Sequence, residues 1–174
     1  DIERPVLTTG TFDGVHLGHQ TILQRLKEVA QREEGQSTLF TFYPHPRMVL
    51  YPNDNDLKLL TTQKEKSELL DAAGLDHLVI VPFSRTFSRM HALDFVRDVL
   101  VDSMRIHAMV IGYDHRFGRN REGDITLLRQ LGEAYDFGVE EIPAQEIDYV
   151  KVSSTKVREA LLKGEVGLAG ELLG

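Results

Sequence analysis

Five short segments with the residue types of β-strands alternate along the chain with longer segments that carry a helical pattern. The expected strands are residues 6–9, 37–42, 77–82, 108–112 and 139–142. Strands that alternate with helices in this way form a parallel sheet, because each helix returns the chain to the same end of the sheet. The sequence therefore predicts an α/β fold: a Rossmann-like, doubly wound parallel sheet with helices on both faces.

The helical segments are identified by apolar residues spaced to lie on one face. The first spans residues 18–34, and its apolar positions 22, 23, 26, 29 and 30 follow the helical period. Further helices are expected at residues 62–73, 92–101, 124–135, 154–162 and 166–173. Three prolines interrupt residues 43–60, which we expect to form a long loop.

Length and charge restrict the class of protein. The chain has 174 residues, a formal net charge of −7 and no cysteine. This length fits one domain with its own core. The negative charge argues against a nucleic-acid partner, which selects for a basic surface. Disulfides and thiolate metal sites are excluded, and no apolar run approaches the ~20 residues of a membrane helix. We expect a cytoplasmic protein without a membrane partner.

The segment after the first strand carries the most distinctive motif. Residues 10–19 read GTFDGVHLGH and lead directly into the first helix. Ligands of doubly wound sheets bind at the carboxyl ends of the strands, and a helix start there offers free N–H groups to an anion. Gly14 and Gly18 allow close approach of the backbone, and His16 and His19 can donate to phosphate oxygens. A phosphate site is favoured over a capped turn with surface histidines, and a zinc site would need further ligands.

A second helix start follows the fifth strand. Residues 153–158 read SSTKVR, so hydroxyl groups and a forked guanidinium stand at the first turn of the helix. These groups can hold phosphate, although a capped surface helix explains the segment equally well when it is considered alone. The segment lies at the same edge of the sheet as residues 10–19, and two such helix starts facing one cleft suit a triphosphate.

The segments after the second and fourth strands combine aromatic and polar groups. Residues 41–46 read TFYPHP, and residues 112–123 are rich in glycine and arginine with interleaved aromatics. Such surfaces suit a planar ring with polar edges, and they also suit single-stranded RNA. Phe83 and Phe87 are four residues apart and belong either to the core or to a ligand site.

Taken together, these motifs resemble the nucleotidyltransferase superfamily with a His-x-Gly-His signature. Within it the chain is similar to the bacterial FAD synthetase family of bifunctional riboflavin kinase/FMN adenylyltransferases. The motifs that carry the resemblance are residues 12–19, 41–46, 82–83, 112–118 and 153–158. The resemblance implies a nucleotidyltransferase-type fold over residues 1–174 and transfer of AMP from ATP to FMN, with Mg²⁺ accompanying ATP and no protein metal site. A covalently linked riboflavin kinase module is implied in the full-length protein.

The resemblance also implies roles for individual residues. It assigns His16, His19 and Arg158 to catalysis. The implied ATP-binding residues are Gly10, Thr11, Phe12, Asp13, Gly14, His16, Gly18, His19, Ser153, Ser154, Thr155 and Arg158. The implied FMN-binding residues are Tyr43, His45, Pro46, Phe83, Phe87, Asp114 and Arg116. The alternatives are an adenylyl- or cytidylyltransferase with another phosphate acceptor, and a non-catalytic nucleotide- or RNA-binding module.

Overall fold

A parallel sheet of five strands forms the centre of the computed structural model, which describes residues 2–53, 56–148 and 152–174. The strands are β1 (Pro5–Thr9), β2 (Gln36–Tyr43), β3 (His77–Pro82), β4 (Ala108–Gly112) and β5 (Gly138–Ile142). Their order is β3-β2-β1-β4-β5, and every pairing is parallel. The predicted α/β doubly wound sheet is therefore confirmed.

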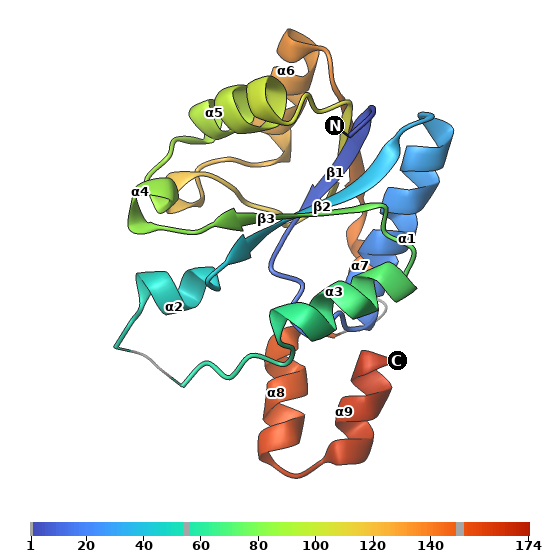
Figure 1. The fold of residues 1–174 in the computed structure, drawn as a ribbon, viewed down its shortest axis with the longest axis vertical. Coiled ribbons are helices and arrows are strands. Elements are labelled where there is room, and N and C mark those ends of the chain that lie inside the picture. Colours follow the sequence, from blue (N-terminus) through green and yellow to red (C-terminus); the bar gives the residue numbers. More distant parts are fainter. Residues whose placement is uncertain (1, 54–55, 149–151) are drawn as a thin grey trace.

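Helices cover both faces of this sheet (Figure 1). The helical elements are α1 (Leu17–Arg32), α2 (Pro46–Leu50), α3 (Gln63–Ala72), α4 (Arg85–Ser88), α5 (Ala92–Asp94), η1 (Phe95–Ser103), η2 (Arg119–Arg121), α6 (Ile125–Tyr135), α7 (Ala144–Asp148), α8 (Ser154–Leu162) and α9 (Val166–Leu173). One face packs against α1, α3 and α7, and the other against α4, α5, η1 and α6. Helices α8 and α9 form a hairpin at the lower end of the view.

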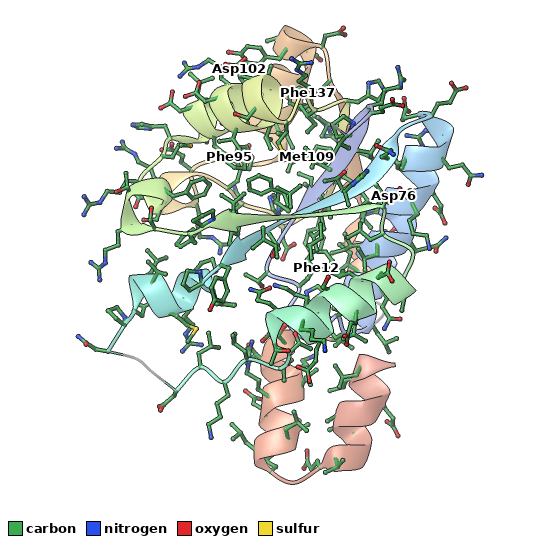
Figure 2. The ribbon with its side chains drawn as sticks, viewed as in Figure 1. Phe12, Asp76, Phe95, Asp102, Met109 and Phe137 are labelled. Atoms are coloured by element: carbon green, nitrogen blue, oxygen red, sulfur yellow. The ribbon has the colours of Figure 1, made fainter. Side chains whose placement is uncertain are left out.

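The buried strands supply side chains to two separate cores. In β4, Met109 belongs to the core under η1 and α6, whereas the next residue, Val110, belongs to the core under α1 and α3. Successive side chains of a strand point to opposite faces, so a strand covered on both faces reads as a continuous apolar run. Figure 2 shows Met109 and Phe95 in the first of these cores and Phe12 toward α3.

The sheet topology fixes the position of a ligand site. Strand β1 pairs with β2 on one side and with β4 on the other, so the strand order reverses at β1. The crossovers on the two sides of this point turn to opposite faces and leave a crevice at the carboxyl ends of β1 and β4. The segments that follow Thr9 and Gly112 therefore border the crevice.

Three sequence predictions about helices were incomplete. Residues 43–60 were expected to be a loop, but they contain α2, because Pro46 occupies the first helical position and His45 caps it by accepting a hydrogen bond from Arg47 N (3.2 Å). The predicted helix at 92–101 consists of the short α5 followed by the π-helix η1. Helix α7 had not been expected between β5 and residues 153–158.

Candidate nucleotide-binding site

The segment between β1 and α1 has a backbone that ordinary residues seldom adopt. Phe12 and Val15 have positive φ angles of 48° and 42°, as does Gly14 at 84°. For a bulky or β-branched residue such an angle is strained and persists only when packing holds it. Packing does so here, because both apolar side chains are buried in the core under α1. A rigid, strained turn at the reversal point of the sheet is typical of a ligand-binding segment.

Both histidines of the motif stand in one stack of rings. The centroids of His16 and His19 are 3.6 Å apart, and the Phe12 ring lies 4.4 Å from His19 on the other side. His16 also caps α1, because its Nδ1 accepts a hydrogen bond from the backbone N–H of His19 (3.3 Å). Since Nδ1 is an acceptor, a neutral His16 ring carries its proton on Nε2, which makes Nε2–H a donor.

Burial keeps the two imidazoles neutral. It lowers the pKa of His16 to about 4, an effect that Asp13 opposes and Arg158 reinforces. The pKa of His19 is also well below its ordinary value, because the ring is buried and lies near His16 and Lys66. Neutral rings act on an anion as hydrogen-bond donors rather than as cations. The sequence left the charge state open, and the structure favours the neutral form.

Gly18 is required by the position of the His16 ring. A Cβ atom added at Gly18 would lie 3.1 Å from His16 Cε1 and 3.2 Å from its Nδ1. Such contacts are tighter than almost all those that real side chains make, so the ring would have to move. The glycine between the two histidines therefore sets their geometry.

Asp13 ties the motif to two distant segments. Its buried carboxylate accepts hydrogen bonds from Leu60 N (2.9 Å), from Thr61 N (3.2 Å) and from the Arg158 guanidinium. Arg158 in turn donates through Nε to the Lys58 carbonyl (2.8 Å). The two residues, 145 positions apart, therefore form a buried ion pair that the sequence had not indicated.

The start of α8 lies directly beside this turn. Ser154 Oγ donates to the Asp13 carbonyl (2.9 Å), and Ser153 caps α8 by accepting from Lys156 N (3.3 Å). Thr155 is exposed in the first turn. The contact between Ser154 and Asp13 confirms the sequence-based expectation that the two helix starts meet at one edge of the sheet.

The residues predicted to bind FMN do not all lie together in the structure. His45 is half-buried, and the charges of Asp13, Arg158 and Lys66 all act on it, while burial lowers its pKa. Tyr43 and Pro46 flank it at the end of β2 and the start of α2. These residues lie on the same side of the molecule as the histidine stack.

Phe83 and Phe87 are held by other aromatic rings. They pack on each other and on Phe42, with centroids 5.5–5.8 Å apart, and Phe87 also packs against the core under η1. Only Phe87 lies in a helix, because α4 begins at Arg85. Their spacing of four residues therefore does not place the two rings on one helical face.

The segment after β4 contributes one contact at the crevice. His115 Nε2 lies 3.1 Å from Thr9 Oγ1, at the end of β1, and burial lowers the pKa of this histidine to about 4. Its predicted neighbours face outward: Asp114 is exposed, and Arg116 forms an exposed ion pair with Asp124 (3.2 Å). Both neighbours were predicted site residues, whereas His115 was not.

Lys66 is the second residue that sequence reasoning missed. It lies in α3 with only 6% of its surface exposed, and Nζ donates to the Thr11 carbonyl (3.1 Å). A signal was available: positions 66, 70 and 73 form the inward stripe of the predicted helix, where a lysine is out of place.

Within the described residues no group of three or more histidine, aspartate or glutamate side chains is arranged to hold a metal ion. The described helices also include none long and apolar enough to cross a membrane.

Comparison with known proteins gives a consistent picture. The sequence model of the FAD synthetase family matches residues 1–156. The chain is 38% identical to the bifunctional riboflavin kinase/FMN adenylyltransferase of Escherichia coli K12 over 169 residues, which cover 97% of the chain but 54% of that protein. It is 36% identical over its whole length to an FAD synthetase of Listeria monocytogenes, of which it covers 70%.

Among solved structures, a crystal structure described as a macrolide-efflux protein from Streptococcus pneumoniae is similar over the whole chain. The TM-score is 0.83 and the sequence identity 29%, and the match covers 57% of that protein. The chain thus spans about half the length of the bifunctional relatives that it matches.

Proposed function

The chain belongs to the FAD synthetase family, and we propose that it transfers AMP from ATP to FMN, with FAD and pyrophosphate as the products. The observation that carries this proposal is the meeting of the α1 and α8 starts at the end of β1, with two neutral histidines at the same place. Two helix starts aimed at one region suit a chain of phosphates better than they suit a single phosphate.

The reaction requires alignment of the two substrates more than acid–base catalysis. A phosphate oxygen of FMN attacks the α-phosphorus of ATP, a new P–O bond forms, and the bond to the bridging oxygen of the leaving pyrophosphate breaks. The FMN phosphate is already ionised near neutral pH, so no general base has to remove a proton. Holding the two phosphates in line and stabilising the charge on pyrophosphate supply the acceleration.

On this proposal the histidines act as donors to the phosphates of ATP. His16 carries its proton on Nε2, because Nδ1 accepts the hydrogen bond of the helix cap, and Nε2–H is the proposed donor. Removal of a comparable donor from a preorganised site costs about 10²- to 10³-fold in rate. The turn residues Gly10, Thr11, Phe12, Asp13, Gly14 and Gly18 shape the nucleotide site.

The α8 start completes the phosphate site from the opposite side. Ser153, Ser154, Thr155 and Arg158 are proposed to face the β- and γ-phosphates. Arg158 has two of its five N–H donors engaged by Asp13 and Lys58, and phosphate oxygens are proposed to accept from the others. Mg²⁺ is proposed to arrive with ATP and to be held largely by phosphates and water.

The flavin is proposed to lie beyond the end of β2. The charges of Asp13 and Arg158 act on His45, which supports a position for His45 between the flavin and the phosphates. The other proposed acceptor residues are Tyr43, Pro46, Phe83, Phe87, Asp114 and Arg116. Phe87 is the weakest member of this set, because its ring packs against the core.

The relatives that are about twice as long as this chain suggest the organisation of the complete protein. We propose that residues 1–174 are the adenylyltransferase domain and that a covalently linked riboflavin kinase module accompanies it in the full-length protein. Kinase activity is not assigned to the residues described above.

An acceptor panel tests the proposed function. Purified protein with Mg²⁺ and ATP is supplied with FMN, phosphopantetheine or nicotinamide mononucleotide, and pyrophosphate release is followed. Of the three acceptors, we expect only FMN to cause pyrophosphate release, and FAD should form at the same time. Release with another acceptor but not with FMN would show that the acceptor is wrong. ATP or RNA binding without pyrophosphate release from any mixture would show a non-catalytic module.

A further inference from the structure

Lys66 is a buried lysine beneath the nucleotide-binding turn. In the part of the chain that the structure describes, the fully buried charged side chains are Asp13 and Lys66, with 4% and 6% of their surfaces exposed. Most lysines lie at the surface, and a buried one is normally paired with a carboxylate. An exception to that rule indicates either a functional role or a ligand that supplies the missing charge.

Among the described residues Lys66 has no such partner. It forms no ion pair with a carboxylate within 4.0 Å, and its one hydrogen bond goes to the Thr11 carbonyl. An ammonium group has three N–H donors, so two of them lack an acceptor in the described part of the structure. Burial lowers the pKa of Lys66, while the nearby charge of Asp13 opposes this shift.

The charges around the turn do not balance. Among the described residues Asp13 is the one buried carboxylate, and it is already paired with Arg158. Two cations thus share one anion, although the whole chain carries a net charge of −7. His19, which is electrostatically coupled to Lys66, adds a buried Nδ1 without a hydrogen-bond partner among the described residues. Such an arrangement is costly until an anion arrives to compensate for it.

We propose that Lys66 is a positioning residue of the nucleotide site: it holds the Thr11 carbonyl, and its uncompensated charge is neutralised by the polyphosphate of ATP. The proposal rests on the proposed function, because it takes a nucleoside triphosphate as the anion. A purely structural lysine would stabilise the unliganded protein, whereas this one is expected to matter mainly when phosphates are bound.

Binding of ATP, inorganic pyrophosphate and adenosine to Lys66→Met and to the wild type, measured by calorimetry without FMN, tests this role. Methionine keeps the length of the side chain and removes its charge. We expect affinity for ATP and pyrophosphate to fall about 10- to 100-fold, which is the effect of losing a charge-assisted contact. Adenosine affinity should not change, because adenosine carries no phosphate.

Two further variants test whether the effect depends on the positive charge and on its place in the helix. Lys66→Arg, which restores a cation, should recover part of the ATP affinity. Lys64→Met is the matched control: Lys64 lies in the same helix with 86% of its side chain exposed, and its removal should leave ATP affinity unchanged. The unliganded Lys66→Met protein should melt no earlier than the wild type, since an unpaired buried charge has been replaced by an apolar group.

The outcomes are distinct. Unchanged ATP affinity in Lys66→Met, an equal loss for adenosine and ATP, equal losses in the Lys64 and Lys66 variants, or a Lys66→Met protein that does not fold would each overturn the proposed role. A wild-type protein that binds no ATP would instead refute the proposed function itself.

Discussion

Asp13→Asn probes the buried ion pair that joins the turn after β1 to α8. The side chains of Asp13 and Arg158 are only 5% and 15% exposed, so solvent screens the pair weakly. Asparagine keeps the size of the side chain but removes the charge, which leaves the Arg158 guanidinium buried without its partner. Removal of one member of a buried pair costs about 3–5 kcal/mol.

This loss is a substantial fraction of the stability of a domain but smaller than the whole. Typical unfolding free energies are about 5–15 kcal/mol, so the variant should stay folded while its urea midpoint falls markedly. Arg158→Met should cost less, about 1–3 kcal/mol, because Asp13 retains the N–H donors of Leu60 and Thr61. The double variant should be more stable than the sum of the two losses implies, by about 1–3 kcal/mol.

The free energy of unfolding is measured for the wild type, the two single variants and the double variant by urea titration, with circular dichroism as the signal. Glu141→Gln serves as the control, because its ion pair with Arg129 is exposed and should be worth at most about 1 kcal/mol. If Asp13→Asn lies within about 1 kcal/mol of the wild type, or if the two losses add without coupling, the reasoning about the buried pair is refuted.

Three further predictions concern the histidines and glycines. His19→Ala should reduce FAD formation at least about 100-fold with an unchanged far-ultraviolet spectrum, and wild-type turnover would contradict the role of the ring. Gly18→Ala should displace the His16 ring and lower kcat about 10- to 100-fold, whereas Gly167→Ala in α9, where a Cβ has open space, should leave turnover unchanged and raise stability by about 0.5–1 kcal/mol. Because His16 and His115 have pKa values near 4 in the folded protein, below the ordinary value of 6.5, the unfolded chain binds more protons between these pH values. The contribution of each histidine to the free energy of unfolding should therefore be complete above pH 6.5 and decrease by about 3 kcal/mol toward pH 4. A urea midpoint that does not change with pH in this range would refute the burial argument.

Much of the fold could be predicted because it depends on local patterns. The inner strands β1, β2 and β4 are largely buried and so are rich in apolar residues, and α1 and α6 carry clear apolar stripes. Short elements were harder. In α2 a proline that was interpreted as a breaker is the first residue of a helix, and nothing in an apolar stripe distinguishes the π-helix η1 from an α-helix.

The site could be predicted in outline, but not in its connections. The motifs indicated which segments meet, since the carboxyl ends of parallel strands share one edge. The pairing of Asp13 with Arg158 depends on side chains that are 145 residues apart, and no local pattern encodes it. Lys66 and His115 were missed because a single polar residue acquires meaning only when its burial is known.

The central claim is that this chain transfers the α-phosphoryl group of ATP, with its adenosine, to FMN. Incubation with Mg²⁺, FMN and ATP labelled at the α-phosphorus tests it most directly, with the products separated by chromatography. We predict that the label moves into FAD and that ATP labelled at the γ-phosphorus releases labelled pyrophosphate. Recovery of the α-label in ADP or free AMP, with none in FAD, would contradict it.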